Sequence, residues 1–114
     1  MPYRMNCLVT GANGAIGYRL CSILQERTYE VIAGLRRKAE GPWDRQIHFD
    51  LTDEAVDCTG LQGISCVFHL AGKAHALGDT RQNYSGYHRV NTDGTRKILE
   101  ASKQAGVRRF VCVL

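Results

Sequence analysis

The sequence of 114 residues lacks several features that define whole classes of protein. No window approaches the ~18 uninterrupted apolar residues of a membrane-spanning helix, and no long apolar core follows the N-terminus as in a secretory signal. No internal repeat, linker or low-complexity tract divides the chain, so we expect one domain over residues 1–114. No grouping of His, Cys, Asp or Glu has metal-ligand spacing. We therefore expect neither a metal site nor a membrane partner.

The five cysteines form no CxxC pair. Cys7, Cys66 and Cys112 lie within apolar stretches, where a small hydrophobic residue would serve equally well. We predict buried, reduced thiols and a cytoplasmic protein, because disulfides persist mainly in oxidising compartments.

Basic residues exceed acidic residues by 15 to 11, which gives a formal net charge of +4. The largest basic cluster is Arg36-Arg37-Lys38, and Arg108-Arg109 is a smaller one. Nucleic-acid binding needs a broader basic face with interleaved aromatic residues, so we expect no nucleic-acid partner. The hydrophobic fraction of 44% is typical of a globular domain.

Strand-like and helix-like segments alternate along the chain. The expected strands are 7–9, 30–35, 46–50, 65–70 and 109–114, and the expected helices are 16–24, a short one at 53–58 with Thr52 as its N-cap, and a long one from about Ser85 to Gly106. Such alternation favours parallel pairing through right-handed crossovers. The predicted fold is α/β, a Rossmann-like doubly wound parallel sheet that is truncated after about five strands.

The stretch Thr10-Gly11-x-x-Gly14-x-x-Gly17 stands between the first expected strand and the first expected helix. Glycines in this context allow a sharp turn, a close approach of the backbone to a pyrophosphate, and close packing of helix on strand. The helix N-terminus then offers unpaired N–H groups to the phosphates. The alternative is an ordinary tight turn, but the flanking strand and helix favour dinucleotide binding.

Three further motifs accompany the glycine turn. They are Asp50-Leu51-Thr52-Asp53 after the third strand, His69-Leu70-Ala71-Gly72 after the fourth, and Val90-Asn91-x-x-Gly94-Thr95 in the long helix. With these four motifs in this order, the chain resembles the N-terminal part of the extended short-chain dehydrogenase/reductases, the NAD(P)-dependent epimerase/dehydratase family that acts on nucleotide sugars. The resemblance covers essentially all of the chain.

The resemblance implies a dinucleotide site along these motifs. The residues around the pyrophosphate would be Gly11, Asn13, Gly14, Ala15 and Ile16, with Gly17 in the same turn; Asp50 and Leu51 would meet the adenine, and Leu70, Ala71 and Gly72 would line the ribose side. Asn91 would support the active site through backbone and water contacts. Two alternatives remain open, since Asp50 could cap the next helix and Asn91 could bind a neighbouring carbonyl.

The end of the second strand selects between the two nicotinamide cofactors. An acidic residue about 20 positions beyond the glycine turn favours the free 2′-hydroxyl of NAD. Here the sequence reads Leu35-Arg36-Arg37-Lys38, and guanidinium groups pair well with a 2′-phosphate. We therefore predict NADP in preference to NAD, with Arg36 and Arg37 as cofactor-binding residues. The alternative is a solvated basic loop.

In the family that this chain resembles, catalysis depends on a Ser or Thr beyond the fifth strand and on a Tyr-x-x-x-Lys pair, whose lysine lowers the tyrosine pKa. None of the five tyrosines is followed by lysine four positions later. We assign no catalytic residue, expect an incomplete domain without its substrate-binding part, and expect a nucleotide sugar to bind only the full-length enzyme. A second class stays open, a non-catalytic dinucleotide-binding or sensor module.

The last expected strand, Phe110-Val111-Cys112-Val113-Leu114, is apolar on both faces. An uncovered apolar strand invites pairing with another copy, so we expect a homo-oligomer. The alternative is a marginal monomer whose last strand frays.

Overall fold

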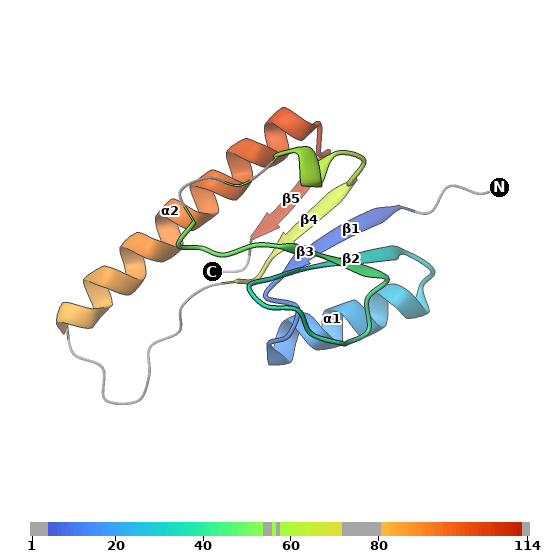
Figure 1. Ribbon diagram of the computed structural model, residues 1–114, viewed down its shortest axis with the longest axis horizontal. Helices are drawn as coiled ribbons and strands as arrows, with labels where there is room; N and C mark the ends of the chain where they lie inside the picture. Colours follow the sequence, from blue (N-terminus) through green and yellow to red (C-terminus); the bar gives the residue numbers. More distant parts are fainter. Residues whose placement is uncertain (1–4, 54–55, 57, 72–80, 113–114) are drawn as a thin grey trace.

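The computed structural model describes residues 5–53, 56, 58–71 and 81–112, and for residues 58 and 81–90 it describes the backbone alone (Figure 1). Its strands are β1 (Asn6–Thr10), β2 (Glu30–Leu35), β3 (Arg45–His48), β4 (Cys66–His69) and β5 (Arg109–Cys112). Its helices are α1 (Ala15–Glu26), the 3₁₀ helix η1 (Cys58–Leu61) and α2 (Arg81–Ala105).

The five strands form one parallel sheet in the order β3-β2-β1-β4-β5. The chain therefore builds outward from β1 to β3 on one side and then crosses to β4 and β5 on the other. In open sheets of this kind, ligands bind outside the carboxyl ends of the strands, where the strand order reverses. Here that switch point lies between β1 and β4, which confirms the predicted fold class.

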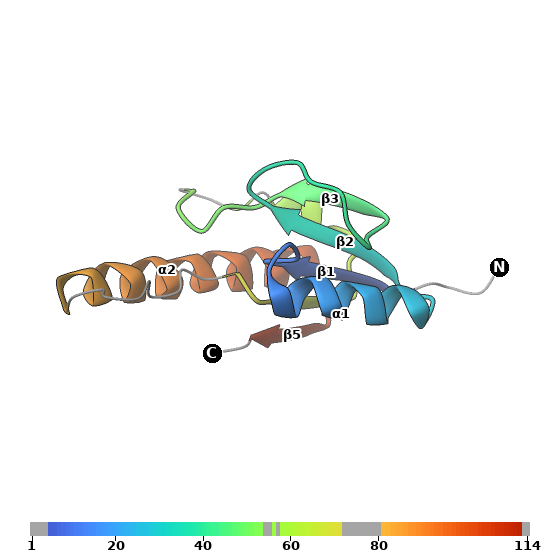
Figure 2. The same cartoon turned by 90° about the horizontal axis from the view of Figure 1, so that it is seen from below.

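The two long helices cover opposite faces of the sheet (Figures 1 and 2). Along β1, Val9 packs in the same cluster as Leu24 of α1, whereas its neighbour Leu8 packs in the same cluster as Ile98 of α2. Side chains of successive strand residues point to opposite faces, so a strand covered on both sides is apolar throughout. This packing explains the uninterrupted apolar stretches of the sequence. The N-terminal part of α2 extends past the carboxyl ends of the strands (Figure 1).

The cysteines behave largely as predicted among the described side chains. Cys7, Cys21 and Cys66 are buried free thiols, and Cys112 is a half-buried free thiol. Burial raises the pKa of Cys7 and of Cys21 to about 11, and the neighbouring Cys66 adds to the effect at Cys7. These thiols therefore serve as small core side chains.

The expected short helix at 53–58 is displaced. The structure has a 3₁₀ helix at Cys58–Leu61, while residues 54, 55 and 57 lie outside the described part. No helix begins at Asp53, so Thr52 has no helix to cap there; its N–H and its hydroxyl both donate to Asp50 Oδ1 (2.9 and 2.7 Å). Asp50 thus forms a local Asx-type turn with Thr52 in place of the expected start of a helix.

Several other boundaries differ from the expected ones by one or two residues, and the start of α2 differs by more. β3 ends at His48, which is in register with Leu35, the last residue of β2, so the ladder has no partner strand beyond that point. Helix α2 begins at Arg81, earlier than the expected start near Ser85. The first residues of the helix are polar, so they show no apolar periodicity from which a helix could be predicted. The expected fifth strand is confirmed from Arg109 to Cys112, and residues 113–114 lie outside the description. No helix among the described residues combines the length and apolarity needed to cross a membrane.

Candidate functional site

The glycine turn links β1 to α1 at the switch point. Gly11 has a φ of +69°, in the left-handed region that favours glycine, and the Gly14 N–H donates to the Gly11 carbonyl oxygen (3.0 Å). Gly14 is the N-cap of α1 and has no side chain with which to bond the first N–H groups of the helix. Those groups are left for an anion, which the helix dipole also stabilises.

Gly17 lets α1 pack directly on this turn. A Cβ at Gly17 would overlap the Gly11 carbonyl oxygen and would lie 2.8 Å from the Gly11 carbonyl carbon and 2.9 Å from the Ala12 Cα. Because all three neighbours are backbone atoms, none can move aside as a flexible side chain would. Gly17 is therefore the close-packing position of the motif.

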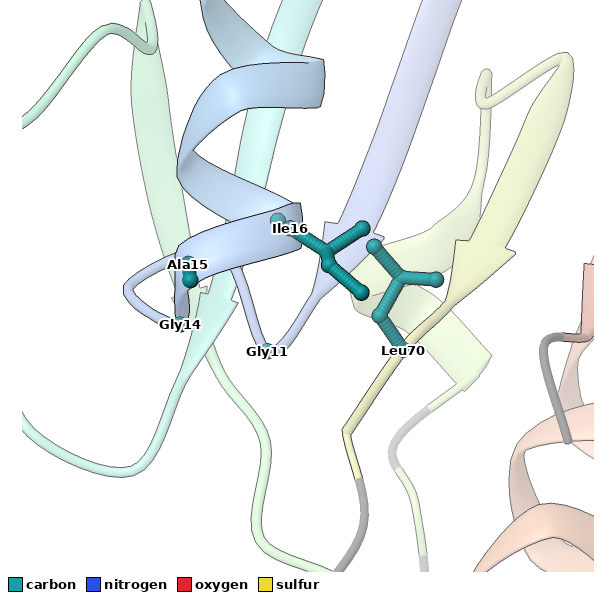
Figure 3. A pocket seen from close by; sticks show the side chains of 6 residues that line it. Gly11, Gly14, Ala15, Ile16 and Leu70 are labelled. Carbon is teal, nitrogen blue, oxygen red and sulfur yellow. The ribbon is translucent and has the colours of Figure 1, made fainter.

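A cavity of about 270 Å³ opens beside the start of α1 (Figure 3). It is lined by Gly11, Gly14, Ala15, Ile16, Gly17 and Leu70. The side chains of Ile16 and Leu70 face one another across it, from α1 and from the end of β4 (Figure 3). Ile16 is 69% exposed, so its apolar side chain is accessible from the cavity.

A larger cavity of about 560 Å³ adjoins the first, and the two share Gly11, Gly14 and Leu70. Its lining comes from the glycine turn and from the residues at and beyond the ends of β2, β3 and β4: Gly11, Asn13, Gly14, Gly34, Leu35, Arg36, Arg37, Phe49, Asp50, Leu51, Thr52, Leu70 and Ala71. Its volume falls within the ~300–1,000 Å³ usual for small-molecule and cofactor sites.

Asp50 contributes a carboxylate to the larger cavity. The two hydrogen bonds from Thr52 to Asp50 Oδ1 lower the pKa of the carboxyl, and the charges of Arg36 and His48 act in the same direction. Asp50 is therefore ionised at neutral pH and accepts hydrogen bonds. Its side chain orders its own turn and also lines the larger cavity.

Arg36 and Arg37 follow β2 directly and are both exposed. Among the described residues, neither guanidinium forms an ion pair with an acidic side chain. Both side chains line the larger cavity, where the Arg36 charge also acts on the Asp50 carboxylate.

The Leu70–Ala71 backbone forms a wall of the site next to Gly11 of the glycine turn. Both N–H groups donate to Thr10 Oγ1 at 3.1 Å. The same hydroxyl lies 2.7 Å from His69 Nδ1, and His69 Nε2 lies 3.0 Å from Thr95 Oγ1 of α2. Burial lowers the pKa of His69 to about 4, so the ring is neutral at neutral pH.

Most of the residues expected at the dinucleotide site line one cavity or both. They are Gly11, Asn13, Gly14, Ala15, Ile16, Gly17, Arg36, Arg37, Asp50, Leu51, Leu70 and Ala71. Gly72 lies outside the described residues. Asn91 is half-buried on α2, one turn before Thr95, and is absent from the described lining of both cavities.

Sequence reasoning assigned no role to Thr10, His69 or Thr95, although each belongs to one of the four motifs. The available signal was their position, since Thr10 and His69 are polar residues at the ends of two neighbouring apolar strands. Fully buried polar side chains at such a place need hydrogen-bond partners, and each has one here.

The model of the NAD dependent epimerase/dehydratase family matches residues 7–113. The chain belongs to this family. A 2-alkyl-3-oxoalkanoate reductase from Stenotrophomonas maltophilia (strain K279a) is 34% identical over 94% of the chain and 32% of the relative. The UDP-glucose 4-epimerase uge1 of Schizosaccharomyces pombe is 34% identical over 91% of the chain and 33% of the relative.

The solved structure of MoeE5 in complex with UDP-glucuronic acid and NAD superposes with a TM-score of 0.78. It is 35% identical and aligns with 94% of this chain and 36% of MoeE5. The chain thus spans about a third of the length of the relatives that it matches.

Proposed function

We propose that this chain is the NAD(P)-binding portion of an epimerase, dehydratase or reductase acting on a nucleotide sugar, and that it binds NADP(H) in preference to NAD(H). The observation that carries the proposal is the larger cavity, where the glycine turn, Asp50 and the two arginines converge. Its lining supplies unpaired N–H groups for a pyrophosphate, an ionised acceptor for the adenosine half, and cations at the end of β2.

The preference for NADP(H) follows from charge. A 2′-phosphate in the cavity would bring negative charge next to Arg36 and Arg37, and a guanidinium can hold it through two parallel hydrogen bonds. Each hydrogen bond to a charged group contributes about 1.5–3 kcal/mol. The free 2′-hydroxyl of NAD gains no such interaction. MoeE5 was solved with NAD, so family membership alone does not select the cofactor.

The chemistry that a bound nicotinamide supplies is hydride transfer. The described residues of this chain would bind and orient the dinucleotide through the glycine turn, and Asp50 would accept hydrogen bonds from the adenosine half. Proton transfer to a substrate needs a positioned acid or base, and the 114 residues contain no Tyr-x-x-x-Lys pair. We therefore propose cofactor binding without turnover for these residues alone. Binding of a nucleotide sugar stays a prediction about the full-length enzyme. Formation of a homo-oligomer stays a prediction about this chain.

The test is a calorimetric titration of the purified chain with NADP(H) and NAD(H), and with 2′,5′-ADP and 5′-AMP as probes of the 2′-phosphate. We expect tighter binding of the 2′-phosphorylated member of each pair. Arg36→Ala and Arg37→Ala should each weaken that member about tenfold or more and leave the other unchanged, since 1.4 kcal/mol corresponds to tenfold in affinity.

Arg19→Ala is the matched control, because it removes the same charge from an exposed position on α1 that lines neither cavity. Equal affinity for the two members of each pair, unchanged in both arginine variants, would refute the NADP(H) preference. If none of the four nucleotides binds, dinucleotide binding itself is refuted.

A further inference from the structure

The hydrogen bonds around Thr10 have one possible direction. A threonine hydroxyl has one hydrogen and two lone pairs. Backbone N–H groups can only donate, so the Ala71 N–H and the Leu70 N–H both donate to Thr10 Oγ1 at 3.1 Å, and the Leu70 N–H is shared with the Thr10 carbonyl oxygen at 3.3 Å. The hydroxyl hydrogen is then left for His69 Nδ1, 2.7 Å away.

This direction fixes the tautomer of His69. Because Nδ1 accepts the Thr10 hydroxyl, the ring hydrogen is on Nε2, which donates to Thr95 Oγ1 at 3.0 Å. His69 is 2% exposed. Its ring packs edge-on against Phe49, with ring centroids 5.8 Å apart, and at a tilt against Phe110, at 6.1 Å. An apolar enclosure of this kind favours the neutral ring that the hydrogen bonds require.

The Leu70–Ala71 backbone is held from a second side by the glycine turn. An added Cβ at Gly11 would lie 2.9 Å from the Ala71 nitrogen and 3.0 Å from the Leu70 carbonyl carbon. Leu70 lines both cavities and Ala71 lines the larger one. A small movement of these two residues would therefore change the shape of the site on the side facing the turn.

We propose that Thr10 and His69 are positioning residues, which hold the Leu70–Ala71 wall of the dinucleotide site through a directed chain of hydrogen bonds ending on Thr95. The positioning role rests on the proposed dinucleotide binding, whereas the chain of hydrogen bonds is a property of the fold. Helix α2 thereby acts on the cofactor site through a buried imidazole, without lining the cavities at Thr95.

The decisive comparison is Thr10→Val against Thr10→Ser. Valine keeps the shape of threonine and removes the hydroxyl, so the Ala71 N–H and His69 Nδ1 each lose a partner. We expect Thr10→Val to weaken binding of NADP(H) about tenfold and to speed hydrogen exchange at the Ala71 amide by a similar factor. Thr10→Ser keeps the hydroxyl and should stay within about twofold of the unmodified chain in both measurements.

Nitrogen NMR of ¹⁵N-histidine-labelled chain reads the tautomer directly. We expect a protonated Nε2 and an unprotonated Nδ1 at His69 in the unmodified chain and in Thr10→Ser, and a mixture of tautomers in Thr10→Val. Thr95→Val is a second variant in case Thr10→Val fails to fold, and it should weaken binding while the exposed Thr92→Val on the same helix should not.

The outcomes separate this proposal from the proposed function. A hydrogen on Nδ1 of His69 in the unmodified chain would overturn the directed chain of hydrogen bonds, whatever the chain binds. Unaltered affinity and unaltered Ala71 exchange in a folded Thr10→Val variant would overturn the positioning role. If the unmodified chain binds no dinucleotide but has the expected tautomer and a slowly exchanging Ala71 amide, the proposed function fails and the hydrogen-bond chain is supported.

Discussion

Gly17 and Gly14 lie in the same turn, yet alanine should do different damage at each. At Gly17 the new methyl group would overlap backbone atoms of Gly11 and Ala12. At Gly14 the nearest atom is the Gly11 carbonyl oxygen at 3.3 Å, a contact that a shift of a few tenths of an ångström relieves. We predict that Gly17→Ala destabilises the fold, and that Gly14→Ala leaves the fold intact but blocks the cofactor.

The magnitude at Gly17 is a difference between two effects. Overpacking costs about 1–3 kcal/mol, and the upper end applies here because the neighbours are backbone atoms. Replacing glycine by alanine inside a helix returns about 1 kcal/mol. The net loss in the free energy of unfolding is therefore about 2 kcal/mol, a large part of the ~5–15 kcal/mol that stabilises a typical domain. A domain of this size should then melt about 8 °C lower.

Gly14→Ala should cost less than about 1 kcal/mol, the usual range for an altered N-cap. Its methyl group, however, would enter the lining that both cavities share, where a pyrophosphate would approach the backbone. Binding of NADP(H) should fall at least tenfold. The two variants should therefore have different phenotypes: Gly17→Ala loses stability, and Gly14→Ala loses affinity for the cofactor.

Urea denaturation followed by circular dichroism, without ligand, measures the first effect, because bound ligand would itself stabilise the fold. Calorimetric titration measures the second. Gly17→Ala with a midpoint equal to that of the unmodified chain would refute the close packing of α1 on the turn. Gly14→Ala with unchanged affinity for NADP(H) would refute the location of the pyrophosphate.

Local patterns in the sequence were sufficient for much of the fold and for the glycine turn. The apolar stretch from Glu30 to Leu35 is a buried interior strand, and its predicted bounds are confirmed. The turn could be recognised because its chemistry is local: Gly11, Gly14 and Gly17 contact one another within seven positions of the chain.

Contacts between distant segments could not be predicted in the same way. Thr10 and His69 are 59 positions apart, and His69 and Thr95 are 26 apart, so no spacing rule relates them. Their meeting requires the strand order of the sheet and the path of α2. The expected cap at Thr52 is wrong because the short helix begins at Cys58, and Thr52 forms a local turn with Asp50.

Two remaining predictions concern thiol reactivity and pH. Because burial raises the pKa of Cys7 and Cys21 to about 11, iodoacetamide at pH 8 should label the half-buried Cys112 well before either of them in the native chain. Mass spectrometry of digested samples would detect the order, and faster labelling of Cys7 would contradict it. The pH dependence of stability should report His69, whose pKa falls from 6.5 to about 4 on folding. Between these values the unfolded chain binds the proton and the native chain does not. The contribution of His69 to the free energy of unfolding is therefore fully present above about pH 6.5 and is lost as the pH falls towards 4. The loss amounts to about 3 kcal/mol, since each unit of pKa difference corresponds to 1.36 kcal/mol. Urea midpoints at pH 7 and pH 4.5 measure it. His69→Gln removes the titrating group, and a folded His69→Gln variant that loses as much stability on acidification as the unmodified chain would refute the buried neutral ring.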